Sequence, residues 1–478
     1  MKKKIVIGGF CFFIGATVAF FAVQFFTKTG IFKVPGALIF DETVSEADIA
    51  MFREAIGDIE LEQDVTFSES FSDSYNGGML VDVFVPVADF YEAREEISTQ
   101  EFEARFKNGE GFLSVLKLDE TKKLLKVGGN YYLDSFNNGA KFKLVEIHGE
   151  NDDDTTRVRE RVTSVLPSFP KKEEVLTFTQ TGVTAMSRGM NAKMAQVGDG
   201  KYFSANLAEF LRQFDFTHTS NESSFSNWAS ASNICSDWRF LDTLTDIGLD
   251  IVELTGNHNV DCGAEDAIST YEKYQELNIK TVGGGRNAVE AELPLRFGAK
   301  GTNVTMLAYN QSTGGATLGD TPGANQYYPE NAQARIREAK ERGDFVIVDV
   351  QFNECNAYDD VNENTYCDRA DSAPGDQVGL FRSLVDMGAD VVVGTSAHQT
   401  QTFEQYNGGE IYYGLGNVFF DQIWWPGTTR SLGLTHYFWN GKLLQTRRFG
   451  TVYDSSYQTR LMNMEEIEWF INRLNQAR

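Results

Sequence analysis

The sequence contains few histidines, cysteines and prolines, and it has no excess of positive charge. Its 478 residues include five His, five Cys and nine Pro, and the formal net charge at pH 7 is −25. Nucleic-acid-binding surfaces need clustered Lys and Arg, so this charge argues against that class of protein. It also argues against tight electrostatic binding of anionic membranes or acidic polymers. The simplest interpretation of the charge is solubility in an exposed compartment.

The N-terminus carries three lysines followed by a long uncharged segment. Lys2–Lys4 precede residues 5–26, which contain no Asp, Glu, Lys or Arg. A helix of this length spans about 33 Å, enough for a hydrocarbon core of about 30 Å. The segment ends in VQFFTK, a poor cleavage site, so it predicts an uncleaved transmembrane signal-anchor. The positive-inside rule places residues 1–4 in the cytoplasm and the rest of this single-pass chain outside it, at the cell membrane.

Four cysteines follow the predicted anchor, and an even number outside the cytoplasm favours disulfides. Cys355 and Cys367 flank the polar loop NAYDDVNENTY and are the preferred pair. Cys235 with Cys262 is the remaining combination. None of the four shows the CxxC spacing of a zinc site.

The length of the chain predicts two folded domains after the anchor. Residues 34–171 mix strand-like and amphipathic helix-like segments, which predicts a small α/β domain of unknown role. The acidic segment 150–174 is interpreted as a hinge region. Residues 172–478 are predicted to form the second domain.

The second domain repeats a helix–glycine–strand–loop plan, which is typical of an α/β sheet. Helices are predicted over residues 238–247 and 378–387, and each is followed by a glycine and an apolar strand. Three of the loops carry His258, Glu354 and His398 just past the end of a strand. Because ligands of such sheets collect at the carboxyl ends of the strands, a shared site is expected there.

Several ordered blocks within residues 174–478 resemble the CapA family of poly-γ-glutamate capsule biosynthesis proteins. THTSNESSF takes the place of the family's Asn-Leu-Glu block and keeps Glu222. VVVGTSAHQTQ resembles its His-Pro-His-x-x-Gln block and keeps His398. LTGNHNVDCG resembles its Asn-Asn-His-x-x-Asp-x-Gly block, matched at Asn257, His258, Asp261 and Gly263.

The resemblance implies a metallophosphatase-like layered sandwich, with helices flanking two central sheets, preceded by the small α/β domain and the transmembrane helix. It also implies a divalent metal (Mn, Zn or Fe) held by Glu222, Asn257 and His398. Such metals activate water and clamp phosphoryl oxygens. His258, oriented by Asp261, would then stabilise charge or protonate a leaving group. The alternative for Asn257 and His258 is a hydrogen-bonded turn that the fold retains without catalysis.

Three positions depart from the family pattern. Val183 stands where the family has Asp, and Gln351 and Ser396 each stand where it has His. Valine cannot bind a metal, and Ser or Gln oxygens are weak donors to transition metals. These replacements argue against metal binding and leave open whether the domain is an enzyme. Val183 is expected to be an apolar group facing a polar pocket, and His218 is either a replacement ligand or packed in the sheet.

The resemblance therefore implies a membrane-anchored, extracytoplasmic protein in capsule or cell-envelope polymer biosynthesis or export, with a partly degenerate metal site. One alternative is an active metal-dependent phosphoesterase. Another is a non-catalytic protein that binds an envelope polymer or acts as a scaffold. The implied partners are the polymer or its precursor, membrane synthase or export subunits, and the membrane itself through the N-terminal helix. Nucleic acid is not expected as a partner.

Overall fold

The computed structural model describes residues 35–312, 314–317, 319–352, 369, 371 and 375–478 of the chain. The predicted anchor and the predicted Cys355–Cys367 disulfide lie outside the described residues. Within these ranges, no helix combines the length and the apolar character needed to cross a membrane.

The chain divides into two compact units. The first contains the residues up to Pro86 together with Ile97–Lys117 and Lys126–Phe169. The second contains Val87–Glu96, Leu118–Leu125 and Pro170–Arg478. Two short segments from the range 34–171 are therefore part of the second unit. Strands and helices occur in both units, which confirms the mixed α/β class.

The first unit is built on a sheet with the strand order β1–β2–β8–β3–β5. β1 pairs parallel with β2, and the other pairs are antiparallel. The strands are β1 (Leu38–Phe40), β2 (Val65–Ser72), β3 (Met79–Asp89), β5 (Phe112–Ser114) and β8 (Lys141–Gly149). Shorter strands are β4 (Glu96–Ile97) and β7 (Lys126–Val127). The helices are α2 (Glu46–Ile56), α3 (Thr99–Asn108), η1 (Val115–Lys117), α4 (Tyr132–Ser135) and α5 (Asp152–Thr163).

Helix α5 lies inside the segment that the sequence suggested to be a hinge. Its N-cap, Asn151, accepts hydrogen bonds from the backbone N–H groups two and three residues further on. Three Asp residues in the first turn stabilise the N-terminal end of the helix dipole. Val158 and Val162, four residues apart, pack in one apolar cluster with Phe52 of α2. Residues 152–163 of this segment are therefore an amphipathic helix, with most of its charges exposed and Asp154 buried. The division between the two units falls at the end of the segment, at Phe169 and Pro170.

The first sheet of the second unit has the order β12–β11–β10–β9–β22–β23–β24. β9 to β12 run parallel, β21 pairs parallel with β9, and β22 pairs antiparallel with the other side of β9. The strands are β9 (Leu176–Thr184), β10 (Phe216–Asn221), β11 (Ile251–Glu253), β12 (Lys280–Val282), β21 (Asn417–Phe419), β22 (Arg430–Trp439), β23 (Lys442–Val452) and β24 (Arg460–Leu461).

The second sheet of this unit has the order β14–β15–β17–β18–β20–β19. The four central strands are parallel, and each edge strand is antiparallel to its neighbour. The strands are β14 (Leu295–Ala299), β15 (Thr302–Asn310), β17 (Phe345–Gln351), β18 (Val391–Gly394), β19 (Phe403–Tyr406) and β20 (Gly409–Tyr412). Shorter strands of the unit are β6 (Lys122–Leu124), β13 (Gly284–Gly285) and β16 (Gly323–Ala324).

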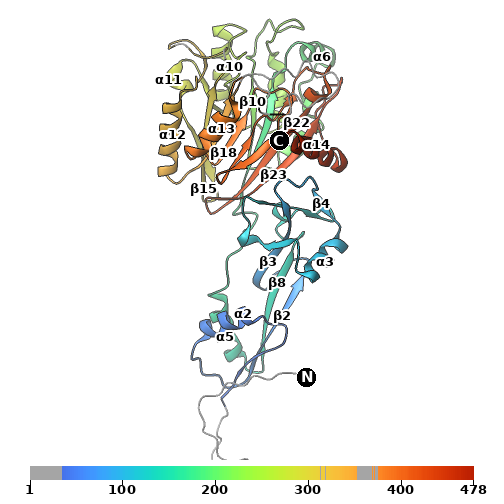
Figure 1. The fold of residues 1–478 in the computed structure, drawn as a ribbon, viewed down its shortest axis with the longest axis vertical. Helices are drawn as coiled ribbons and strands as arrows, with labels where there is room; N and C mark the ends of the chain where they lie inside the picture. Colours follow the sequence, from blue (N-terminus) through green and yellow to red (C-terminus); the bar gives the residue numbers. More distant parts are fainter. Residues whose placement is uncertain (1–34, 313, 318, 353–368, 370, 372–374) are drawn as a thin grey trace, which may run out of the picture. The chain divides into compact units, whose positions relative to one another are not determined.

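The two sheets share one apolar core, and helices cover their outer faces (Figure 1). Side chains alternate along each strand, so Ile347 of β17 packs between the sheets while Val346 and Val348 pack outward against α12 and α13. The helices are α6 (Gly189–Val197), α7 (Lys201–Ser204), α8 (Ala208–Leu211), η2 (Trp238–Phe240), α9 (Leu241–Asp246), α10 (Ala264–Glu276), α11 (Ala288–Ala291), α12 (Pro329–Glu341), α13 (Gln377–Asp386), η5 (Pro426–Thr429) and α14 (Met464–Gln476). Helices therefore flank two central sheets.

Candidate functional site

Four polar side chains lie where parallel strands of the two sheets end. Glu222 directly follows β10, and Asn257 lies in the loop after β11. Gln351 is the last residue of β17, and Ser396 lies two residues beyond β18. These are the carboxyl ends of the strands, which is the edge where a ligand site is expected in such sheets.

Gln351 is the hub of this group of side chains. Its Nε2 lies 3.0 Å from Asn257 Oδ1, 3.2 Å from Ser396 Oγ and 3.3 Å from Glu222 Oε1. The Thr395 hydroxyl donates to the Oε1 of the same amide at 3.4 Å. Gln351 and Glu222 are fully buried. One amide therefore joins strand ends from both sheets, and we call these residues (Glu222, Asn257, Gln351, Ser396, with His398 below) the edge cluster.

His398 lies against the other oxygen of the same carboxylate. Its Nε2 is 3.9 Å from Glu222 Oε2, and its Nδ1 is 2.9 Å from Asn417 Oδ1. The amide nitrogen of Asn417 donates to Gln422 Oε1 and to the carbonyl of Thr428, so its Oδ1 is the acceptor for His398. The Nδ1 of His398 therefore carries a proton, and Nε2 is the nitrogen that faces Glu222.

The loop after β11 carries His258 and Asp261 as a pair. His258 Nδ1 lies 2.7 Å from Asp261 Oδ2, and both side chains are partly exposed. A disulfide between Cys235 and Cys262, with Cα atoms 5.7 Å apart, ties the end of this loop to the rest of the unit. The second-choice cysteine pairing is thus present. In the chain, His258 directly follows Asn257 of the edge cluster.

Val183 does not face a polar pocket. It is fully buried in β9 and packs in a small apolar cluster with Ala185, Phe420 and Tyr453. The Phe420 ring in turn contacts the ring of His398, with centroids 4.7 Å apart. Val183 therefore packs against apolar side chains, and its partners on the neighbouring strands are Ser220 and Asn417.

A second polar group lies between the two sheets and was not predicted. His218 Nε2 of β10 is 3.4 Å from Asp349 Oδ2 of β17, and Gln180 Nε2 of β9 donates to Asp349 Oδ1 at 3.2 Å. Gln180 Oε1 accepts from His436 of β22 at 3.0 Å. We call these four residues the interior cluster. His218 is thus packed within the sandwich, as one of the two sequence interpretations proposed.

Burial decides the charge states of the interior cluster. It lowers the pKa of His218 to about 3 and that of His436 to about 3. Burial also raises the pKa of Asp349 well above its usual range, and the nearby Glu253 carboxylate adds to that rise. Burial therefore favours the neutral form of both His218 and Asp349, which weakens any ion pair between them at their separation of 3.4 Å. The visible signal in the sequence was one Asp inside the apolar strand FVIVDVQ.

The edge cluster does not fit the divalent metal that the resemblance implies. A cation requires lone pairs that converge on it, whereas the group facing Glu222, Asn257 and Ser396 is the NH2 of Gln351, which has only hydrogens to offer. Glu222 is the single carboxylate among these residues. Across the part of the chain that the structure describes, no group of three or more His, Cys, Asp or Glu side chains could hold a metal ion.

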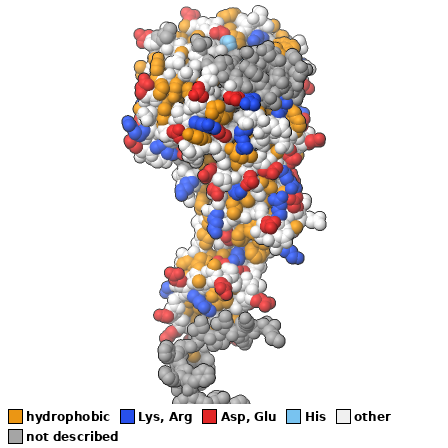
Figure 2. Space-filling model, in the orientation of Figure 1, with side chains coloured by type: hydrophobic (Ala, Val, Ile, Leu, Met, Phe, Trp, Pro, Cys, Tyr) orange, Lys and Arg blue, Asp and Glu red, His pale blue; other side chains and the backbone are white. Residues whose placement is uncertain are grey.

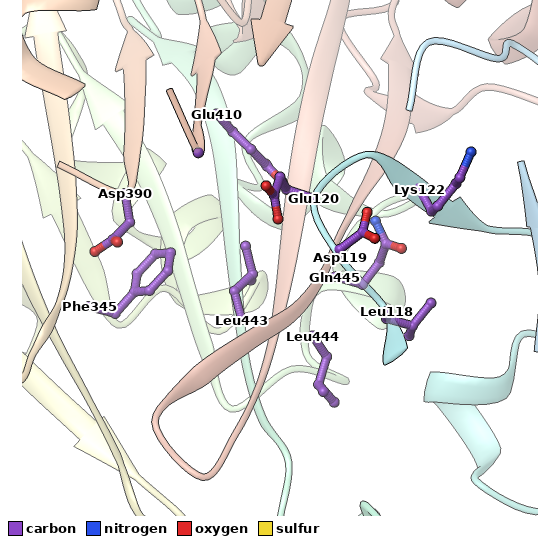
Figure 3. A pocket seen from close by; sticks show the side chains of 11 residues that line it. Leu118, Asp119, Glu120, Lys122, Phe345, Asp390, Glu410, Leu443, Leu444 and Gln445 are labelled. Atoms are coloured by element: carbon purple, nitrogen blue, oxygen red, sulfur yellow. The ribbon is translucent and has the colours of Figure 1, made fainter. Parts of the chain in front are cut away.

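A cavity of about 260 Å³ lies at the opposite ends of the strands of the second sheet (Figure 3). Phe345 begins β17, Asp390 immediately precedes β18 and Glu410 lies near the start of β20. Two of its carboxylates have partners within the protein, since Asp390 pairs with Lys340 at 2.7 Å and Glu410 accepts from the Tyr412 hydroxyl at 2.9 Å. Because the cavity lies at the opposite ends of the strands, it is separate from the candidate site.

The surface has mixed charge. On the face shown in Figure 2, acidic and basic side chains alternate over the described residues without a continuous basic area. This agrees with the overall excess of acidic residues, since Asp and Glu number 68 against 43 Lys and Arg.

The edge cluster lies within a region that matches a protein family. A family model described as bacterial capsule synthesis protein PGA_cap matches residues 177–422, slightly more than half of the chain. The matched region begins in β9 and includes Glu222, Asn257 and His398.

Two known proteins are also similar to part of the chain. It is 25% identical over 280 residues to the capsule biosynthesis protein CapA of Bacillus anthracis, which covers 55% of this chain and 64% of that protein. It is 29% identical over 198 residues to the PGA biosynthesis protein CapA of Bacillus subtilis (strain 168), which covers 41% of this chain and 48% of that protein. The chain thus spans less than two thirds of the length of either relative.

Among solved structures, the NAD nucleotidase of Haemophilus influenzae aligns with 63% of this chain and 62% of its own. The TM-score is 0.32 and the sequence identity is 10%. A TM-score this low does not establish a common fold.

Proposed function

The chain belongs to the bacterial capsule synthesis protein family, and we propose that it acts in the biosynthesis or export of a capsule or cell-envelope polymer of the poly-γ-glutamate type. The observation that carries the proposal is the family match, which spans the strand ends where the edge cluster lies. The names of the two Bacillus relatives support the same role.

The proposal includes a location at the outer side of the cell membrane. The uncharged segment at residues 5–26 supplies the anchor, and Lys2–Lys4 orient it. The Cys235–Cys262 disulfide supports an oxidising compartment. Protease added to intact cells is expected to digest the second unit, and protection that disappears only on lysis would contradict this orientation.

The proposed fold of the second unit is the metallophosphatase-like sandwich. Its support is the layer order, with helices outside two central sheets, and the polar cluster at the carboxyl ends of their parallel strands. Within this fold the Gln351 amide argues against two-metal hydrolysis, which needs several anionic or imidazole ligands.

His258 and Asp261 are the groups we propose to act on the polymer or its precursor. The Asp261 carboxylate holds the Nδ1–H of His258, which orients the imidazole and leaves Nε2 able to exchange a proton. Both side chains are partly exposed, so a ligand can reach them. The second candidate function is binding of the polymer without catalysis, and the hydrogen-bonded edge cluster favours it.

The test uses the full chain in its native cells. Cells without the chain are expected to lose polymer from their surface, and the full-length chain is expected to restore it. An unchanged amount of polymer in the deletion would contradict the proposed role. Restoration by His258→Ala would favour the binding role, whereas failure would favour proton transfer. His148→Ala is the matched control, because His148 is also exposed and also lies beside a carboxylate, Glu146, at 3.1 Å.

A further inference from the structure

The edge cluster contains a carboxylate that needs compensation. Glu222 is fully buried, and a buried carboxylate is costly unless hydrogen-bond donors or cations face it. Its Oε1 faces the Gln351 amide nitrogen at 3.3 Å and its Oε2 faces His398 Nε2 at 3.9 Å. Oε1 is therefore within hydrogen-bond distance of the Gln351 amide nitrogen, whereas the separation of Oε2 from His398 Nε2 is longer than a hydrogen bond.

The orientation of the Gln351 amide follows from its neighbours. A carboxylate can only accept hydrogen bonds when ionised, so the side of the amide that faces Glu222 must be the NH2. The Thr395 hydroxyl donates to the opposite atom, Oε1, at 3.4 Å. A reversed amide would place its oxygen against the Glu222 carboxylate. The NH2 is thus held towards the three oxygens of Glu222, Asn257 and Ser396.

We propose that the Gln351 side chain takes the place of the family's cation, so that the edge cluster is assembled and held together without metal. The NH2 has two hydrogens for three acceptors at 3.0, 3.2 and 3.3 Å, so at least one hydrogen is shared. It links the ends of β10, β11, β17 and β18, which is the cross-link that a bound cation would otherwise provide. This inference concerns how the site is built and does not require the proposed polymer function to be right.

A cation and the Gln351 amide compete for the same position. Any metal that uses Glu222 and Asn257 would have to displace the NH2 from both oxygens. Val183, which packs in an apolar cluster, offers no further ligand that could compensate the metal for displacing the amide. Among the residues that the structure describes, the edge cluster therefore offers a divalent metal no position that the amide does not already occupy.

The first experiment uses the full-length chain purified without chelator. We expect substoichiometric Mn, Zn and Fe by elemental analysis, and a melting temperature that neither EDTA nor added Mn²⁺ changes. A stoichiometric metal that EDTA removes, with a fall in melting temperature, would overturn the proposal. Neither measurement involves the polymer, so a failure of this proposal can be distinguished from a failure of the proposed function.

The second experiment compares two substitutions that both remove the NH2. Gln351→Glu adds a second buried carboxylate beside Glu222 and should create a demand for a cation, so Mn²⁺ should raise its melting temperature. Gln351→Leu adds no acceptor and should show no response to Mn²⁺. An equal response of both variants, or a response of the wild type, would show that the amide does not replace a cation. If Gln351→Glu folds only when Mn²⁺ is present, that result supports the proposal as well.

Discussion

Two polar clusters of the second unit use the same residue types in different places. In the edge cluster, the Glu222 carboxylate faces the His398 imidazole at 3.9 Å. In the interior cluster, the Asp349 carboxylate faces the His218 imidazole at 3.4 Å. The first pair lies beyond the carboxyl ends of strands, and the second lies in the middle of strands between the sheets.

The comparison shows how the position of a carboxyl–imidazole pair in the fold decides its role. Residues of β-strands surround the interior pair, and burial shifts the pKa of each member towards the neutral form. The edge pair borders loops, and its carboxylate receives an amide donor from a neighbouring strand end. The loop that carries Asn257 of the edge cluster also carries His258 and Asp261, and both of these side chains are partly exposed. The functional hypothesis therefore rests on the edge cluster, and the interior cluster is expected to govern stability.

The largest expected loss of stability follows from removing the disulfide near the edge cluster, because the strands of the interior cluster have no such cross-link to lose. The Cys235–Cys262 disulfide closes a sequence separation of 27 residues next to Asp261. Replacing both cysteines with Ser should lower the free energy of unfolding by about 3.5 kcal/mol on the chain-entropy estimate. Denaturant unfolding of the two proteins measures this. Equal stabilities would show that the loop needs no such tie.

The next effect concerns the hub of the edge cluster. Gln351→Leu leaves the buried Glu222 without its amide donor, and we expect a loss of about 3 kcal/mol in the free energy of unfolding. The double variant Gln351→Leu with Glu222→Leu removes the uncompensated carboxylate as well and should recover part of that loss. A double-mutant cycle from denaturant unfolding gives the coupling. Strictly additive losses would contradict a direct interaction.

The interior cluster predicts a pH dependence with a definite sign. Asp349 binds its proton more tightly in the folded state because burial raises its pKa, whereas the unfolded chain releases it above the ordinary value of 3.8. Its contribution to stability is therefore lost as the pH rises from that value towards the folded pKa, at about 1.4 kcal/mol for each pH unit.

Asp349→Asn is the variant that tests this sign. The amide is nearly isosteric with the protonated carboxyl and does not titrate. The free energy of unfolding of the variant should therefore not decline as the pH rises above 3.8. Unfolding measured between acid and neutral pH compares the two slopes. The control is His218→Gln, because the lowered pKa of His218 costs stability only as the pH falls below its ordinary value of 6.5. Parallel pH profiles for Asp349→Asn and the wild type would contradict the raised pKa of Asp349.

The smallest effect on stability is expected at the pair proposed to act on the ligand. His258 and Asp261 are partly exposed, and exposed ion pairs contribute about 0–1 kcal/mol. His258→Ala should therefore change the free energy of unfolding by less than about 1 kcal/mol, even if it abolishes polymer restoration. A large loss of stability would mean that His258 has a structural role, which would weaken the functional hypothesis.

Several features could be read from local patterns in the sequence. The helix–glycine–strand–loop plan placed His258, Glu354 and His398 beyond strand ends. The structure has His258 and His398 there, and Glu354 lies outside the described residues. The expected helix at 378–387 is α13 (Gln377–Asp386). These predictions succeed because hydrophobic periodicity and helix-ending glycines act within a few residues of one another. The helix in the charged segment before residue 164 was not predicted, because Val158 and Val162 pack in part against residues about a hundred positions earlier, such as Phe52.

Only the tertiary structure decided what the replaced residues do. Gln351 appeared in the sequence as the loss of a histidine, and its role as a donor to Glu222, Asn257 and Ser396 depends on three other strand ends. The contact between His218 and Asp349 joins two sheets across 131 residues of sequence, and no local pattern encodes it. The sequence by itself determined which polar residues stand at strand ends. The tertiary structure decided which of them meet, because hydrogen bonds and burial depend on neighbours brought together only by the packing of the two sheets.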